Sequence, residues 1–269
     1  MQYDPIKKTL GRFFSEPVFM RKVFYSLLDL LLLRTWHVKR ALRKFSQLHP
    51  GEVAVLDAGA GFGQYTWRMS RMNKLWKIKA IDIDSEHIND CGKFFASAGL
   101  SDRVSCETCD LASFDEKAAY DMILCVDVME HIREDERVLR NFNRALKPDG
   151  MLLISTPSDK GGSDVHSEKE HSFIDEHVRN GYGTGEISRK LTEAGFKDVG
   201  VSYTYGRPGN ISWRLSMKYP VKMLNASGIF YVILPFYFML VIPVSLILNC
   251  LDLNFKHKSG TGLLVTASR

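Results

Sequence analysis

Between residues 51 and 205, short apolar runs alternate with longer stretches in which apolar residues recur at helical spacing. The apolar runs predict strands at residues 53–59, 77–84, 103–110, 120–128, 151–157 and 199–205. The periodic stretches predict helices at residues 64–72, 85–98, 134–146 and 184–196. We expect Ser85 and Thr184 to cap their helices, and Pro148 and Gly150 to end the third helix in a turn. This alternation favours a doubly wound α/β fold, with a parallel sheet covered on both faces.

The two ends of the chain follow other patterns. Residues 17–45 have a helical pattern that is apolar on much of its circumference and rich in Arg and Lys. Residues 229–251 form an apolar run of 23 residues without a charged side chain. We therefore divide the chain into a helical N-terminal arm (1–50), a core (51–205), an apolar, basic-flanked insertion (206–259) and a last strand (260–269).

The net charge of +5 is unevenly distributed along the chain. Residues 1–50 carry a net charge of +7 and residues 203–269 one of +6, whereas the segment between them carries −8. This distribution argues against a nucleic-acid partner, which usually requires a basic binding domain. Basic, apolar ends fit an anionic membrane surface, where each basic residue near the lipid contributes about 1 kcal/mol. The alternative is that both ends pack against the acidic core.

The first predicted turn contains residues suited to binding a nucleoside. The sequence LDAGAGFG places Gly59, Gly61 and Gly63 two residues apart after the first strand, where glycine permits a tight turn and the close approach of a ligand. Asp82 ends the second strand, where a carboxylate can hold ribose hydroxyl groups, and Asp110 follows the third strand. The spacing D-x-G-x-G-x-G differs from the G-x-G-x-x-G of nicotinamide-binding sites, which argues against that cofactor.

These motifs resemble those of the class I S-adenosylmethionine-dependent methyltransferases. The resemblance rests on VLDAGAGFG, AIDID, CDL, YDMILCVDVMEHI, LKPDGMLLISTP and LTEAGF, which occur in the family's order over residues 51–205. It implies a Rossmann-like seven-stranded sheet, mostly parallel with an antiparallel last strand. It also implies S-adenosylmethionine as the cofactor and S-adenosylhomocysteine as the product. The residues that it implies for cofactor binding are Asp57, Gly59, Ala60, Gly61, Gly63, Asp82, Ile83, Asp110, Leu111, Val126 and Asp127.

The resemblance also implies which part of the cofactor each of these residues would bind. The loop at residues 59–63 would hold the methionine part, Asp82 would bind the ribose, and Ile83 would lie on the adenine. Asp110 and the amide that follows it would meet the edge of the adenine. The backbone at residues 126–127 would face the methionine amino group.

Methyl transfer from a sulfonium depends on alignment and exclusion of water more than on acid–base chemistry. A phenol or enol acceptor would gain from a base, and Glu130 and His131, just beyond the fourth strand, are the first candidates. His166 and His171, in the polar loop after the fifth strand, are further candidates. Their spacing fits no known metal-ligand pattern, so we expect a polar lid over the acceptor pocket and no metal site.

Other residue patterns narrow the acceptor class. The chain lacks an Asn/Asp-Pro-Pro-aromatic tetrapeptide after the fourth strand, and it lacks a Pro-Cys pair that could supply a nucleophile for pyrimidine C5. We therefore expect an acceptor other than a nucleobase. Tyr182 and Tyr205 could line the acceptor pocket or pack in the core. Cys106 and Cys109 form a lone CxxC without a second pair, which does not complete a zinc site.

The last strand restricts how residues 229–251 can meet a membrane. Residues 260–269 resemble the family's antiparallel seventh strand, which must pair in the same sheet as the sixth. A single span would separate these strands across the bilayer, and two legs of about ten residues cannot cross a core of roughly 30 Å. Because Pro235 and Pro243 should break the run into short pieces, we predict a monotopic element in one leaflet. The alternative is contact with the arm or with a second copy of the chain.

The resemblance and the apolar segments together predict a methyltransferase on the cytoplasmic face of a membrane. Its acceptor would be a hydrophobic small molecule such as a quinone, a polyprenoid or sterol-like molecule, or a lipid. Two alternatives remain open. One is a soluble enzyme for a polar metabolite, whose insertion forms a homo-oligomer, and the other is a non-catalytic module that binds S-adenosylmethionine.

Overall fold

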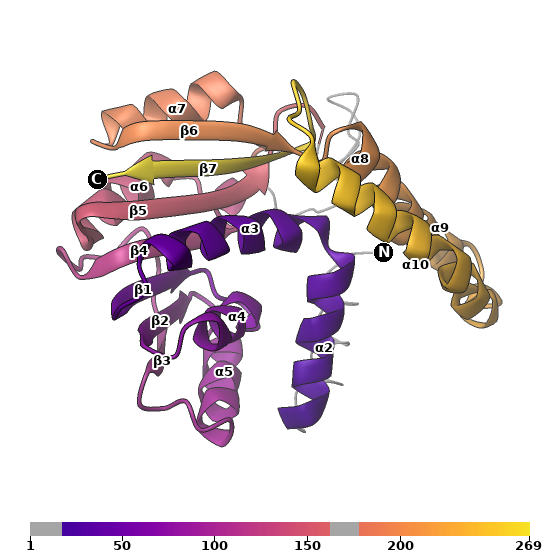
Figure 1. Cartoon of the computed structure of the whole chain (residues 1–269), viewed down its shortest axis with the longest axis horizontal. Coiled ribbons are helices and arrows are strands. Elements are labelled where there is room, and N and C mark those ends of the chain that lie inside the picture. Colours follow the sequence, from indigo (N-terminus) through magenta and orange to yellow (C-terminus); the bar gives the residue numbers. More distant parts are fainter. Residues whose placement is uncertain (1–17, 162–177) are drawn as a thin grey trace.

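A computed structural model of the chain describes residues 18–161 and 178–269. Its centre is a seven-stranded sheet with the strand order β3-β2-β1-β4-β5-β7-β6 (Figure 1). The strands are β1 (Val53–Ala58), β2 (Trp76–Asp82), β3 (Val104–Thr108), β4 (Tyr120–Val126), β5 (Leu146–Pro157), β6 (Lys197–Thr204) and β7 (Gly262–Ser268). β1 to β5 are parallel to one another, and β7 is antiparallel to both of its neighbours. The predicted fold class is confirmed.

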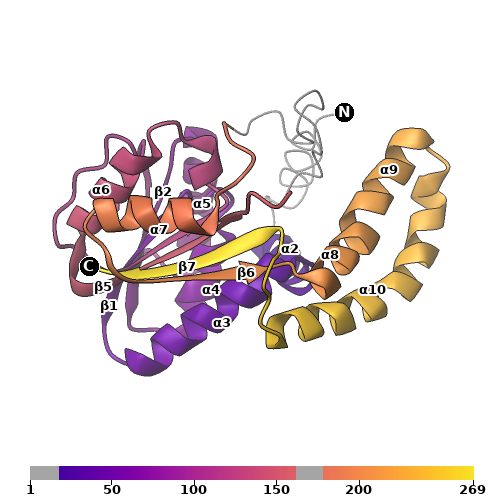
Figure 2. The same cartoon turned by 90° about the horizontal axis from the view of Figure 1, so that it is seen from above.

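Helices cover both faces of this sheet (Figures 1 and 2). One face carries α2 (Val18–Leu31), α3 (Leu33–Leu48), α4 (Gln64–Met72) and α5 (Ser85–Ser97), and the other carries α6 (Asp135–Ala145) and α7 (Thr184–Glu193). Each face has its own buried cluster. Leu42, Phe45 and Trp76 lie in the first, and Phe142 and Leu191 lie in the second. The predicted division of the chain at residues 50, 205 and 259 stays a prediction.

β7 lies between β5 and β6, as the predicted sheet requires. Leu263 is the register partner of Thr156 in β5 and of Tyr203 in β6. The side chains of Leu263, Val265 and Ala267 are buried in the core. Because β6 and β7 pair directly, the insertion between them leaves the sheet and returns to the same place.

Three local predictions were wrong in detail. The α5 helix is capped by Asp84, whose carboxylate accepts hydrogen bonds from the amides of Glu86 and His87, and not by Ser85. Gly183 precedes α7 without a side-chain cap, so Thr184 does not act as one. The LKPDG segment at residues 146–150 belongs to the start of β5, next to an irregularity in the β4–β5 register. In each case the N-cap position or the start of the strand lies at least one residue earlier in the chain than the sequence pattern predicts.

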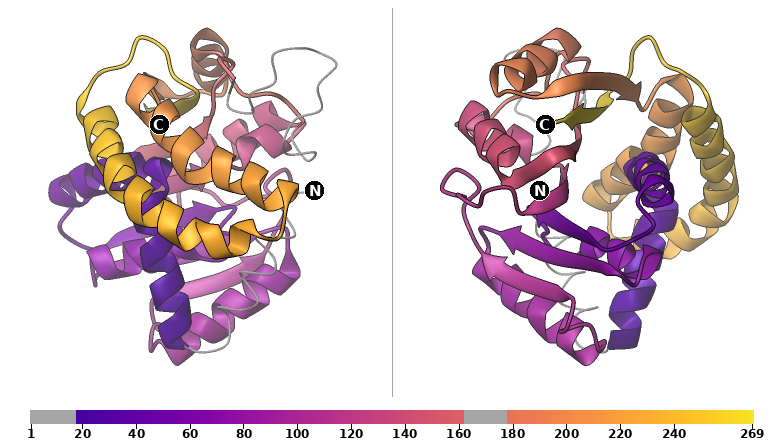
Figure 3. Two further views of the ribbon diagram at one scale, coloured as in Figure 1. Left: turned by 90° about the vertical axis from the view of Figure 1, so that its right-hand side faces the viewer. Right: turned by 60° about the vertical axis from the view of Figure 1, so that its left-hand side comes forward.

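The insertion forms a helical hairpin that projects from the sheet (Figures 2 and 3). Its first leg runs through α8 (Arg207–Trp213), the π-helical turn η2 (Arg214–Lys218) and α9 (Tyr219–Ala226), and its second leg is α10 (Phe230–Asn254). Within the described residues, α10 is the helix whose length and apolar composition would suit a membrane crossing.

The expectation that prolines break residues 229–251 into short pieces was wrong. α10 is continuous through Pro235 and Pro243 and curves along its length (Figure 2). A proline inside a helix removes one backbone hydrogen bond, and a bend commonly accommodates it. The first leg of the hairpin, from α8 to α9, is supplied by residues outside the apolar run. The expected pair of ten-residue legs within residues 229–251 is therefore not what forms the hairpin.

Candidate functional site

The glycine loop between β1 and α4 has the backbone conformation that its sequence predicts. Gly59, Gly61 and Gly63 all have positive φ, at +78°, +50° and +77°. A Cβ on Gly59 would lie 2.2 Å from Cγ2 of Val128, so this position excludes any side chain. A Cβ on Gly61 would meet no heavy atom within 4 Å. The loop is therefore closely packed on one side and open at Gly61 on the other.

The carboxylate of Asp82 lies directly beside this loop. One of its oxygens accepts a hydrogen bond of 2.8 Å from the amide of Gly61, and the other accepts one of 3.0 Å from the amide of Asp84. A carboxylate can accept about four hydrogen bonds, so acceptor capacity remains for two ribose hydroxyl groups. The next side chain, Ile83, is 71% exposed although it is apolar. An exposed Ile beside a fixed carboxylate suits a flat ring attached to a ribose.

Asp110 follows β3 at the same edge of the sheet. Its side chain accepts a hydrogen bond of 2.9 Å from the amide of Ala112, which fixes the turn after the strand. The side chain of Leu111 is buried, and its carbonyl accepts a hydrogen bond of 3.0 Å from Asn141. The resemblance assigns the backbone amide of Leu111 to the adenine edge. This amide thus lies in a turn that the hydrogen bonds from Ala112 and Asn141 stabilise.

Asp57 is buried near the end of β1. Its carboxylate is buried and accepts a hydrogen bond of 2.5 Å from the hydroxyl of Thr66 in α4. Burial raises the pKa of Asp57 to about 7, although the hydrogen bonds from Thr66 oppose this shift. In this geometry Asp57 ties β1 to α4, and a role in cofactor binding stays a prediction.

The end of β4 meets the N-terminal arm. Asp127, which follows Val126, has an unusual positive φ of +52° and forms an ion pair with the guanidinium of Arg34. The backbone amide of Arg34 donates a hydrogen bond of 3.0 Å to the hydroxyl of Tyr205, another residue with positive φ. A positive φ in a residue other than glycine costs free energy, and residues with this backbone conformation cluster at functional sites. Arg34 therefore connects two strained residues at the carboxyl end of the sheet.

Glu130 lies one turn further along, in the 3-10 turn η1 (Met129–His131). Its carboxyl group is 1% exposed and accepts a hydrogen bond of 3.1 Å from the hydroxyl of Thr156 in β5. Burial, and then the charge of Asp127, raise the pKa of Glu130 to about 8, whereas Arg34 acts in the opposite direction. Glu130, Asp127 and Arg34 thus form one electrostatic cluster.

The other candidates for acid–base chemistry are placed differently. His131 is partly exposed in the same turn as Glu130. His166 and His171 lie outside the described residues. Tyr182 is fully buried, with its hydroxyl 2.8 Å from Oδ2 of Asp135 and 3.1 Å from the carbonyl of Met129. Tyr182 is therefore a packing residue, whereas Tyr205 contacts the cluster at the end of β4.

Sequence reasoning missed the residues through which the arm holds the glycine loop. Arg21 of α2 is 3% exposed, and its guanidinium donates hydrogen bonds of 2.8 Å to the carbonyl of Phe62 and 2.7 Å to Asp90. The hydroxyl of Tyr25 also donates to the carbonyl of Phe62. The available signal was an arginine on the apolar stripe of a helix, four residues before a tyrosine.

A comparison with protein families decides which group of enzymes has this site. The model of a family described as a methyltransferase domain matches residues 49–195. The chain belongs to this family. The resemblance to class I S-adenosylmethionine-dependent methyltransferases is confirmed, and so is S-adenosylmethionine as their cofactor. The open side of the loop at Gly61 and the exposed Ile83 beside Asp82 fit this nucleoside.

Curated relatives match the methyltransferase at low identity. A ubiquinone biosynthesis O-methyltransferase of Xanthomonas axonopodis pv. citri is 24% identical over 111 residues, which are 41% of this chain and 46% of the relative. A ubiquinone biosynthesis O-methyltransferase of Neisseria meningitidis serogroup C is 24% identical over 149 residues, which are 52% of this chain and 62% of the relative. The chain thus spans about half the length of these relatives.

Solved structures share the fold of the methyltransferase. Phosphoethanolamine N-methyltransferase 2 of Haemonchus contortus, in complex with S-adenosylmethionine, has a TM-score of 0.61 at 18% identity, covering 86% of this chain and 52% of that chain. A sarcosine dimethylglycine methyltransferase assigned in Galdieria sulphuraria has a TM-score of 0.57 at 16% identity, covering 87% and 86%. The [4+2]-cyclase SpnF has a TM-score of 0.57 at 18% identity, covering 86% and 80%.

Proposed function

We propose that this protein transfers a methyl group from S-adenosylmethionine to a hydrophobic small molecule that it takes from a membrane surface. A quinone, a polyprenoid or sterol-like molecule, or a lipid would have the required chemistry. The names of the quinone-biosynthesis relatives support this acceptor class. The observation that carries the proposal is the distribution of polar and apolar residues around α10.

The polarity of α10 is inverted relative to a helix of a water-soluble protein. Large apolar side chains such as Phe236, Leu240 and Ile247 are 67%, 75% and 63% exposed. Of the four residues of α10 that are buried, three are polar, namely Ser245, Asn249 and Asp252, and the fourth is Leu234. A soluble helix turns its apolar stripe inward. A helix with its apolar side outward suits contact with lipid, and so large an exposed patch marks an interaction surface.

The hairpin geometry supports contact from one side of a bilayer. The hairpin starts and ends at the sheet, since its first leg follows β6 and its second leg leads back to β7. Basic residues lie where the hairpin meets the body, including Lys256 and Lys258, which are exposed. An anionic, cytoplasmic membrane surface would attract such residues. We therefore propose a peripheral, monotopic attachment in which the sheet stays on the aqueous side.

When bound, S-adenosylmethionine supplies a methyl group on a positively charged sulfur, which an acceptor nucleophile can attack. The glycine loop and Asp82 would hold this cofactor at the carboxyl edge of the sheet. Arg34 and Asp127 would close that edge and exclude water, which favours in-line transfer. We assign Glu130 as the base for an acceptor hydroxyl group, since its raised pKa lies near neutral pH. His131 is the alternative base.

The test is an incubation of lipid extracts with isotopically labelled S-adenosylmethionine, followed by mass spectrometry of the extracted products. We expect label in an apolar product with the wild type and none with Asp82→Ala. Calorimetry should show that Asp82→Ala weakens S-adenosylhomocysteine binding by roughly 100-fold, because two charge-assisted hydrogen bonds are lost. Asp102→Asn, an exposed carboxylate outside the site, is the matched control. Label confined to water-soluble products would contradict the acceptor class.

Flotation with vesicles tests the membrane contact separately. Phe236→Ser with Leu240→Ser should reduce binding roughly 100-fold or more, since each large side chain contributes about 1.5–3 kcal/mol when buried. The control is Leu48→Ser with Leu75→Ser, two exposed apolar side chains elsewhere. A wild type that does not float with vesicles, and that dimerises through α10 whether or not lipid is present, would favour an oligomer surface.

A further inference from the structure

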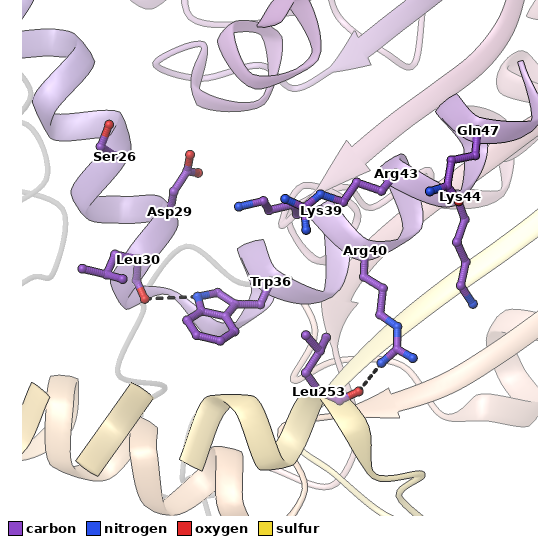
Figure 4. A pocket seen from close by; sticks show the side chains of 10 residues that line it. All are labelled: Ser26, Asp29, Leu30, Trp36, Lys39, Arg40, Arg43, Lys44, Gln47 and Leu253. Atoms are coloured by element: carbon purple, nitrogen blue, oxygen red, sulfur yellow. Dashed lines mark hydrogen bonds between the residues drawn. The ribbon is translucent and has the colours of Figure 1, made fainter. Parts of the chain in front are cut away.

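A basic cleft lies between α2, α3 and the C-terminal end of α10 (Figure 4). It encloses about 580 Å³, which is large enough for a phosphorylated head group. Its wall on α3 presents Lys39, Arg40, Arg43 and Lys44. These residues fall on one face of the helix because their spacing matches the helical repeat. No part of the cofactor site described above contributes to it.

The positive charges of this cleft are not neutralised by the described chain. Asp29 is the acidic residue that lines it, and its carboxylate already pairs with Arg68 and accepts a hydrogen bond of 2.9 Å from Gln64. No carboxylate within residues 18–161 and 178–269 forms an ion pair with Lys39 or Arg43. Burial, and then the charge of Arg43 four residues further along α3, lower the pKa of Lys39.

Like charges spaced four residues apart on a helix destabilise it, so this arrangement requires an explanation outside helix stability. An anion placed among the four side chains would remove the repulsion. Arg40 is fixed in position, since its guanidinium donates a hydrogen bond of 2.5 Å to the carbonyl of Leu253. The indole of Trp36, which also lines the cleft, donates a hydrogen bond of 3.1 Å to the carbonyl of Leu30.

The cleft lies at the end of α10 that joins the body, near exposed apolar residues of this helix. Leu253 lines the cleft, and the exposed residues Ile247 and Leu251 lie within two helical turns of it. Phe255, just past the end of α10, is 61% exposed. A tryptophan, an exposed phenylalanine and several cations at one end of an apolar surface resemble the composition of a membrane interface. A molecule with a charged head and a long apolar tail would cover both surfaces.

We propose that this cleft binds the phosphate group of an anionic phospholipid whose acyl chains lie along α10. This inference rests on the membrane attachment proposed above, and it adds a specific anchoring site to it. Lys39, Arg43 and Lys44 would donate to the phosphate oxygens, and Arg40 would hold the wall in place. The exposed apolar side chains of α10 near the cleft are the reason to prefer a lipid over a free phosphate ion.

The test measures flotation of the full-length protein with vesicles of phosphatidylcholine, alone or mixed with phosphatidylglycerol. The cleft variant is Lys39→Gln, Arg43→Gln and Lys44→Gln, which keeps Arg40 and its contact with Leu253. The control variant, Lys117→Gln, Arg140→Gln and Lys197→Gln, removes three exposed charges outside the cleft. We expect the cleft variant to bind mixed vesicles roughly 100-fold more weakly and neutral vesicles as well as the wild type. The control should bind both as the wild type does.

Equal losses in the cleft and control variants would mean that net charge alone acts, and would overturn the site. A cleft variant that binds mixed vesicles normally, beside an α10 variant that does not, would overturn the site and leave the membrane attachment intact. A wild type that binds neither vesicle would overturn both. Calorimetry with inorganic phosphate separates the two sources: binding that the cleft variant loses, with vesicle binding unchanged, would assign the cleft to free phosphate. The cleft variant should also unfold at an unchanged or higher temperature, and a large decrease would make its charges structural.

Discussion

Asp252, near the end of α10, should determine how firmly the hairpin is attached to the sheet. Its side chain is fully buried, and three hydrogen-bond donors and the imidazole of His257 surround its carboxylate. One carboxylate oxygen lies 3.0 Å from Nε2 of His37 and 3.2 Å from the amide of Tyr205. The other lies 3.0 Å from the amide of Gly209 and 3.1 Å from Nε2 of His257. This one carboxylate therefore joins α3, the end of β6, α8 and the segment before β7.

The magnitude of an Asp252→Asn substitution follows from this geometry. The NH2 group of asparagine would take the place of one of the two carboxylate oxygens. In either orientation this NH2 group would face a backbone N–H, which cannot accept a hydrogen bond. A buried donor without an acceptor costs about 1–3 kcal/mol. Removing one partner of a buried ion pair costs about 3–5 kcal/mol. We expect a loss of about 3 kcal/mol in the free energy of unfolding and a decrease of about 6–12 °C in Tm.

Urea unfolding and hydrogen exchange by mass spectrometry measure the two consequences. Exchange should accelerate in peptides covering α8 and the end of α10, while the strands β1 and β4 change little. Asp198→Asn, an exposed carboxylate that accepts from Ser268, is the matched control and should change stability by less than about 0.5 kcal/mol. A loss below about 1 kcal/mol with unchanged exchange would refute the role of Asp252 as the anchor.

The same anchor has a defined dependence on pH. Burial alone would raise the pKa of Asp252, but the hydrogen bond from His37, the charge of His257 and the amide of Gly209 hold the pKa below its usual 3.8. A carboxyl group whose pKa is lowered by folding stabilises the protein above its unfolded pKa. This contribution is lost as the pH falls through the lower, folded-state pKa. The difference between wild type and Asp252→Asn should therefore shrink only in strong acid.

Three further predictions concern the site itself. In the wild type the rate of methyl transfer should rise with pH through about 8, as Glu130 loses its proton, and Glu130→Gln should abolish this rise; a profile that is unchanged in Glu130→Gln would favour His131. Gly59→Ala should lower the free energy of unfolding by about 2 kcal/mol or more, because its Cβ would overlap Val128, and adding Val128→Ala should restore part of it in urea unfolding. Arg21→Met should weaken S-adenosylhomocysteine binding roughly 10-fold in calorimetry, since the loop carbonyl of Phe62 loses one of its two donors, and unchanged affinity would show that α2 only packs there.

The core could be predicted from the sequence because each of its elements follows a short-range rule. Helix α4 matches its prediction at both ends, as its sequence changes from glycines to helical spacing at Gln64 and ends before Asn73. The site at Gly61 and Asp82 could be anticipated for the same reason, since a turn and the strand end beside it have a local signature. The resemblance then added the expected antiparallel last strand.

The arm and the hairpin could not be predicted in this way, because their structure depends on contacts between distant residues. Arg21 pairs with Asp90, and Arg34 pairs with Asp127, with no periodic pattern to connect them. Pro235 was expected to break the helix, yet α10 continues through it and packs along α8, η2 and α9. The position of Asp252 among its hydrogen-bond donors is likewise a product of the tertiary fold.

The pairing of β6 with β7 has a consequence for the order in which the chain can fold. β6 is an edge strand, and its neighbour in the sheet is β7, which the ribosome makes only after the whole hairpin. Until residues 262–268 emerge, β6 has no partner strand in the sheet. The apolar hairpin is therefore exposed during synthesis, before β7 completes the sheet. If a bilayer receives it at that moment, completion of the sheet and arrival at the membrane become one coupled event.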